Sequence, residues 1–132
     1  MAVRINEQFI SRLRRLIRDV YDRSSNDPII YRTKERVFAL CDINPSKVID
    51  RVGTVLFRYR DDIINGGDAF FYLDLRNDVT MDNFNDFDYV NKKIGVVYQT
   101  LDSEEREVYR DDIYEMLELY IDYETTRSSE KS

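Results

Sequence analysis

The chain has 132 residues, of which 42% are hydrophobic and 35% charged, with 4 glycines, 2 prolines and a net charge of -6. This composition is typical of one globular domain and excludes collagen, a mucin-like stalk and a disordered tail. Histidine, the usual general base and metal ligand near neutral pH, is absent, and Cys41 is the only cysteine. We therefore expect a protein that is not an enzyme, that holds no metal or other cofactor, and that has no internal disulfide.

The charge is divided unevenly along the chain. Residues 1–60 carry 13 Lys and Arg against 7 Asp and Glu, a net +6, whereas residues 61–132 carry 7 against 19, a net -12. Such asymmetry affects solubility and the choice of binding partners, and does not by itself define a fold.

The first predicted helix covers about residues 6–23, with Asn6 as its N-cap and a turn at 24–28 as its end. Thr33 is expected to cap a shorter segment that contains Val37 and Cys41 and closes at Asn44-Pro45. The apolar residues of the first helix recur at spacings of three and four and so share one face: Ile5, Phe9, Leu13, Leu16, Ile17, Val20 and Tyr21.

Asn44-Pro45 predicts the start of a third helix, because an N-cap followed by proline is a favoured helix opening. This helix is expected to end at 65–67, where glycine can adopt the left-handed C-cap conformation. Gly53 lies inside it and indicates either close approach of another backbone or simple tolerance. Its apolar stripe consists of Val48, Val52, Val55, Leu56, Tyr59 and Ile63.

Residues 68–76 are compatible with a buried strand or with two turns of helix; Asp68 as a cap favours helix. Residues 77–86 are expected to form a loop, and the apolar spacing from Phe87 to Leu101 predicts a fourth long helix. Asp102 and Glu105 form a capping-box pattern that starts the last helix. Its core stripe is Tyr109, Ile113, Met116, Leu117 and Tyr120, with Tyr123 at the edge.

These elements together predict an all-α fold. We expect a single-domain helical bundle of four main helices plus one or two short helices over residues 1–124, followed by a disordered polar tail over 125–132.

The last predicted helix concentrates acidic residues on the side opposite its core stripe. Neighbouring carboxylates at spacings of three and four repel one another, so the strip costs helix stability. It is interpreted either as a solvated face of an acidic protein or as an acidic partner-binding face; one helix face spreads the carboxylates too far apart to surround a metal ion. The strip consists of Glu104, Glu107, Asp111, Glu115, Glu118 and Asp122.

Two helices of the basic half carry a candidate basic face. Side by side, they could bind phosphates, since arginine forms bidentate contacts with phosphate oxygens. Against nucleic-acid binding stand neighbouring acidic residues and a pI of about 4.7, and the alternative is a pair of salt-bridged surfaces or intramolecular pairing with the acidic helix. The basic face consists of Arg14, Arg15, Arg18, Lys47, Arg51 and Arg58.

Other motifs fail on inspection. With Asp82 as the first residue of a calcium loop, the third position is Phe84, and Gly66-Gly67 lacks the phosphate-binding loop pattern. Cys41 has apolar neighbours and is expected to be a buried, inert thiol. Apolar residues outside the main stripes predict contact with a further element or another chain: Phe57, Ile64, Tyr114, Leu119 and Ile121.

The sequence favours a helical interaction or assembly protein that uses a basic N-terminal half and an acidic C-terminal helix as unlike surfaces. Its partner is expected to be another protein or a second copy, and a small structural component of a virus particle is one form of such a protein. The alternative is a nucleic-acid-associated or transcription-related factor that binds phosphates through the basic face. No segment resembles a membrane span or a signal peptide, so we expect an intracellular protein, cytoplasmic or nuclear, or one associated with a virion.

Overall fold

The computed structural model describes residues 2–24, 27–72 and 86–131. No strand occurs in these residues, and the predicted all-α single-domain bundle is confirmed. None of the helices in this part of the chain is long and apolar enough to cross a membrane. The helices are α1 (Ala2–Arg23), α2 (Pro28–Ile43), α3 (Pro45–Arg58), α4 (Arg60–Ile64), the short 3₁₀ helix η1 (Ala69–Tyr72), α6 (Asp86–Tyr98) and α7 (Ser103–Lys131).

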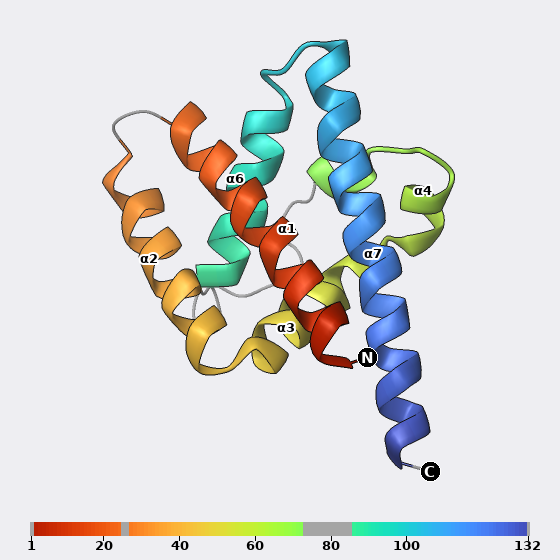
Figure 1. Ribbon diagram of the computed structural model, residues 1–132. Coiled ribbons are helices and arrows are strands. Elements are labelled where there is room, and N and C mark those ends of the chain that lie inside the picture. Colours follow the sequence, from red (N-terminus) through yellow and green to blue (C-terminus); the bar gives the residue numbers. More distant parts are fainter. Residues whose placement is uncertain (1, 25–26, 73–85, 132) are drawn as a thin grey trace.

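Helix α1 runs through the middle of the bundle, with α2 on one side and α7 on the other (Figure 1). It packs against both of these helices and also against α3 and α6. Its predicted apolar stripe supplies much of the core, because Phe9 and Ile17 are completely buried and Leu13, Leu16 and Val20 nearly so. Helix α4 lies beyond α7 on the side away from α1, so α2 and α4 form opposite edges of the molecule.

Helix α2 begins earlier than the sequence predicts. Asp27 is its N-cap, accepting hydrogen bonds from the backbone N–H groups of Ile29 and Ile30 at 3.0 and 3.4 Å, and Pro28 occupies the first helical position. The expectation that Thr33 caps this segment is therefore wrong: Thr33 is buried inside α2. The predicted start of α3 is confirmed, because the Asn44 side chain accepts a hydrogen bond from the backbone N–H of Lys47.

The third predicted helix is interrupted at Tyr59, whose backbone N–H donates to the Leu56 carbonyl in a tighter turn before α4 begins. The predicted left-handed glycine is Gly66, with φ of 80°. Gly53 does mark a close approach, and what approaches is the ring of Tyr120 on α7 instead of a backbone. A side chain at position 53 would occupy space held by that ring, so glycine allows α3 and α7 to pack closely.

The ambiguous segment at 68–76 is helical where the structure describes it, as η1. Phe71 stacks on Tyr98 of α6 with ring centroids 3.9 Å apart, and Gly95 leaves room for the Phe71 carbonyl. Residues 73–76 and the predicted loop up to residue 85 lie outside the described residues, and Asp86 is the first residue of α6.

Helix α7 has 29 residues and is about 43 Å long at 1.5 Å per residue. The sequence predicts a disordered tail from residue 125, whereas the structure continues α7 through to Lys131. Arg127 gives a physical reason for this difference: its guanidinium contacts both carboxylate oxygens of Asp50 on α3, at 2.9 and 3.2 Å. The end of α7 is thereby held against α3, although it projects beyond the other helices (Figure 1).

Candidate functional site

The first turn of α7 is fixed to the end of α6. Asp102 caps α7 by accepting a hydrogen bond from the Glu105 backbone N–H at 2.9 Å, as the capping-box pattern predicts. Arg106 donates from Nε to the carbonyl of Tyr98 at 3.2 Å and from a terminal nitrogen to that of Gln99 at 3.0 Å. These bonds hold the start of α7 against the end of α6.

The predicted core stripe of α7 is buried, from Tyr109 to Tyr123. The side opposite this stripe lies in solvent, and all six carboxylates of the predicted acidic face are exposed. The placement of the acidic face on the outside of α7 is thus as the helical projection predicts. That face also carries two exposed apolar side chains, Val108 and Tyr114.

Carboxylates on the flank of α7 that faces α1 are paired with arginines. Arg12 contacts Asp112 at 3.3 Å and Glu115, and Arg15 contacts Asp112 at 3.1 Å. Near the start of α7, Arg23 contacts Glu105 at 2.6 Å. Part of the basic half is therefore neutralised within the molecule by the acidic helix, which is one of the alternatives that the sequence leaves open.

Asp112 is the most buried of these paired carboxylates, with 14% of its side chain exposed. Burial raises its pKa above the ordinary value, and the neighbouring Arg15 and Arg12 oppose that rise. Close by, Tyr109 donates a hydrogen bond to Asp19 of α1, and burial raises the pKa of this hydroxyl. The α1–α7 contact therefore combines the apolar core with partly buried polar contacts.

The remaining five carboxylates of the predicted face have no such partners. Among the residues that the structure describes, none of the five lies within 4.0 Å of a basic group, and we call them the outer strip. Glu115 belonged to the predicted face but is paired with Arg12, so it is not included. The outer strip consists of Glu104, Glu107, Asp111, Glu118 and Asp122.

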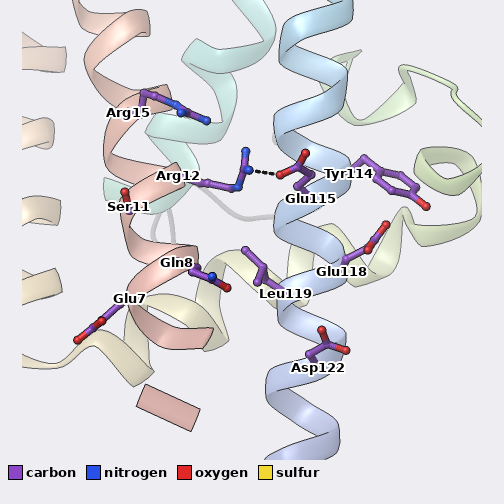
Figure 2. A pocket seen from close by; sticks show the side chains of 10 residues that line it. All are labelled: Glu7, Gln8, Ser11, Arg12, Arg15, Tyr114, Glu115, Glu118, Leu119 and Asp122. Carbon is purple, nitrogen blue, oxygen red and sulfur yellow. Dashed lines mark ion pairs between the residues drawn. The ribbon is translucent and has the colours of Figure 1, made fainter. Parts of the chain in front are cut away.

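A groove of about 680 Å³ lies between α1 and α7 (Figure 2). The Arg12–Glu115 ion pair crosses it, and Gln8 and Leu119 extend into it from the two helices. Tyr114 and Glu118 point away from α1, on the far side of α7. The groove is lined by Glu7, Gln8, Ser11, Arg12, Arg15, Tyr114, Glu115, Glu118, Leu119 and Asp122.

A second, smaller hollow of about 270 Å³ lies between α4 and α7. Its lining combines apolar side chains with three charged ones, Glu107, Arg110 and Asp111, of which Glu107 and Asp111 belong to the outer strip. Tyr114 lines both the groove and the hollow, so it forms a ridge between them. The hollow is lined by Ile63, Ile64, Gly66, Gly67, Phe71, Glu107, Arg110, Asp111, Ile113 and Tyr114; we call it the α4–α7 hollow.

The apolar residues predicted to need a partner divide into two groups. Leu119 and Ile121 are partly buried against the core, so this chain covers part of each side chain. Phe57, Ile64 and Tyr114 are exposed, at 42, 54 and 38%. Ile64 and Tyr114 both line the α4–α7 hollow, which therefore joins exposed apolar surface to part of the outer strip.

The predicted basic face is distributed over several contacts. Arg14 pairs with Asp42 of α2, whereas Arg15 turns to the other side of α1 and pairs with Asp112 of α7. Arg18 lies over the ring of Phe38 on α2, at 5.3 Å from the ring centre.

The members of the basic face on α3 are all exposed: Lys47, Arg51 and Arg58. Arg51 lies 6.0 Å from the ring centre of Phe87 on α6. The structure does not collect the six basic residues into one strip, because those on α1 divide between contacts with α2 and α7 and Arg51 contacts α6.

Two features of this surface were missed by sequence reasoning. Arg12 pairs with carboxylates on the flank of α7 and was not among the predicted basic residues, because the sequence does not indicate which side of α1 meets α7. No sequence pattern indicates the α4–α7 hollow, because it depends on how α4 packs against α7.

The described residues hold no group of three or more His, Cys, Asp or Glu side chains placed to bind a metal ion. Cys41 is buried, as predicted, and its burial raises the pKa of the thiol.

No protein-family model matches this chain, and neither a curated protein nor a solved structure matches it. The interpretation of α7 therefore depends on its geometry and charge.

Proposed function

We propose that this chain is a non-enzymatic helical interaction protein that binds a basic protein partner through the outer strip of α7. The observation that carries the proposal is the contrast between the two flanks of this helix. Toward α1, Glu105, Asp112 and Glu115 each have an arginine partner. On the outer strip, no basic group of the described residues comes within 4.0 Å of any carboxylate.

Repulsion between the carboxylates of the outer strip supports the proposal, because it lowers the stability of the free helix. Glu107–Asp111 and Glu118–Asp122 are like-charged pairs four residues apart, and each destabilises the helix by about 0.2–0.5 kcal/mol. A lysine from a partner would remove that repulsion on binding. Exposed Tyr114 between the groove and the hollow adds a rigid aromatic contact of the kind enriched in interfaces.

The shape of the surface favours a protein partner over a small ligand. The groove and the hollow are both open to solvent. Their lining mixes carboxylates with aliphatic and aromatic groups. A partner segment with basic side chains at helical spacing and a few apolar anchors would match both features. Assembly into a larger particle is one setting for such a contact.

The test is affinity capture from the native source with three forms of the chain. In the first variant, Glu107→Lys and Asp111→Lys reverse the centre of the outer strip. In the control, Asp22→Lys and Asp61→Lys reverse two exposed carboxylates on α1 and α4, with the same change in net charge. We expect wild type and control to recover the same basic protein, and the outer-strip variant to recover at least tenfold less.

The expected recovery by wild type also falls with added salt, because exposed charges are screened. Equal recovery of that protein by the outer-strip variant, with the fold verified by circular dichroism, would contradict the proposal.

A further inference from the structure

The α4–α7 hollow has the size of one long side chain. Three of its apolar lining residues, Ile63, Phe71 and Ile113, are buried, whereas Ile64 and Tyr114 are 54 and 38% exposed. Its volume of about 270 Å³ equals that of about nine waters in the liquid, and a helix with its side chains is about 10–12 Å across. The hollow therefore has room for a side chain of a partner and not for a whole helix.

The charge of the hollow is negative even when its own cation is counted. Glu107, Arg110 and Asp111 line it and sum to -1. Arg110 donates to the Tyr98 hydroxyl at 3.0 Å, and that hydroxyl donates to Asp68, also at 3.0 Å. Arg110 is therefore held toward the end of α6, where Asp68 adds a further negative charge, so the hollow and its edge together carry -2.

Helix α4 brings no further cation to the lining. Its one basic residue, Arg60, lies over the ring of Phe57, 4.3 Å from the ring centre, and donates to the Phe57 carbonyl at 3.0 Å. Among the residues that the structure describes, Arg110 is thus the one cation that lines the hollow.

These properties match the side chain of lysine. Its four-carbon stem covers apolar surface such as that of Ile64 and Tyr114, while its ammonium stays at the polar edge. Glu107 and Asp111 are four residues apart on α7, which places their Cβ atoms about 5–6 Å from each other. A compact ammonium with three donors can contact both carboxylates, whereas the planar guanidinium of arginine is suited to one.

We propose that the α4–α7 hollow binds a lysine side chain of the basic partner, with the stem against Ile64 and Tyr114 and the ammonium between Glu107 and Asp111. This inference rests on the proposed function, because both carboxylates belong to the outer strip. It adds that the partner is held at one place along this strip by apolar contact as well as by charge.

The test is an NMR titration of the isotope-labelled protein with lysine whose amino and carboxyl groups are blocked as amides. The norleucine derivative has the same four-carbon stem without the ammonium, and the arginine derivative has a different cation. We expect the lysine derivative to shift, in a saturable way, the backbone amides of residues 63–67 and 107–114. The other two derivatives should bind at least about fivefold more weakly, because each lacks part of the match.

Two variants separate the charged and apolar parts of the site. Glu107→Gln combined with Asp111→Asn removes the charge, and Ile64→Ser removes the exposed aliphatic contact. Ile43→Ser on α2 is the matched control, because Ile43 is also an exposed isoleucine, at 80%. All four positions are exposed, so we expect every variant to stay folded. The lysine derivative should bind both site variants at least about fivefold more weakly than wild type, and the control equally well.

The inference is overturned if the lysine derivative shifts no amide of the hollow up to its solubility limit, or shifts those around Glu118 and Asp122 instead. Equal binding of the norleucine derivative, tighter binding of the arginine derivative, or unchanged binding by either site variant also overturns it. The proposed function still stands in these cases if the Glu107→Lys, Asp111→Lys variant loses its captured protein. If that variant keeps the protein, the proposed function fails whether or not the lysine derivative binds.

Discussion

Asp27 connects the turn before α2 to α6. Its carboxylate contacts the Lys93 ammonium at 2.7 Å and accepts a hydrogen bond from the Tyr89 hydroxyl at 2.9 Å, while also capping α2. The Lys93 contact is the largest influence on its pKa, followed by burial, which acts in the opposite direction, and then by Tyr89 and the two backbone N–H groups. The net effect lowers the pKa of Asp27 to about 2.

Because the folded-state pKa of Asp27 is below the unfolded one, ionised Asp27 stabilises the fold above about pH 4. That contribution is lost as the pH falls from about 4 to about 2. We predict that Asp27→Asn, which can still cap α2, unfolds more easily at pH 6 and loses less stability between pH 4 and pH 2 than wild type. Urea denaturation at a series of pH values measures this.

Asp22→Asn is the control for that series, because Asp22 is exposed on α1. We expect its acid dependence to follow that of wild type. If the stability of the Asp27→Asn variant falls between pH 4 and pH 2 as steeply as that of wild type, then Asp27 is not the group responsible for that loss.

At the scale of elements, Arg127 holds the end of α7 to α3. Arg127 contacts Asp50 and lies 5.8 Å from the ring centre of Tyr123, with 41% of its side chain exposed. Exposed ion pairs contribute at most about 1 kcal/mol, so we predict that Arg127→Ala changes global stability little. It should instead loosen the last turns of α7 locally.

Amide hydrogen exchange measures this prediction. We expect faster exchange after residue 123 in Arg127→Ala, with rates near Ile113 unchanged. Glu124→Ala is a control at a neighbouring position. The contact of Glu124 with Arg127, at 3.6 Å, lies within α7 and does not join α7 to another helix. Unchanged exchange at the end of α7 would show that helix propensity alone maintains it.

Most helices could be predicted because their signals are local. The stripes of α1 and α7 need only a period of 3.6, and the caps at Asn44 and Asp102 need only neighbouring residues. The start of α2 was missed although Asp27-Pro28 is the same pattern as Asn44-Pro45, because the turn residues before it indicated an ending. The break at Tyr59 has no glycine or proline, and the apolar spacing continues through it.

At the scale of the whole molecule, the charge asymmetry of the sequence has two parts. Part of the charge is neutralised within the molecule, where Arg12, Arg15 and Arg23 pair with carboxylates of α7. The rest remains on the surface as the outer strip. The position of this strip could be predicted from the helical projection, but its separation from the paired flank could not, since that depends on which side of α7 meets α1.

The α4–α7 hollow belongs to the same scale. It combines residues from α4, the glycine turn, η1 and α7, and no local pattern indicates that these segments meet. The exposure of Ile43 was equally hidden, because the end of α2 becomes visible only when the packing of α2 against its neighbours is known.

Carbodiimide cross-linking of the captured complex tests the role of the outer strip most directly. The reagent joins a carboxylate to a lysine only when the two are in contact, and mass spectrometry identifies the joined residues. We predict that partner lysines are joined to Glu107, Asp111 or Glu118. Cross-links of partner lysines only to carboxylates elsewhere, such as Asp22 or Asp61, would contradict the account.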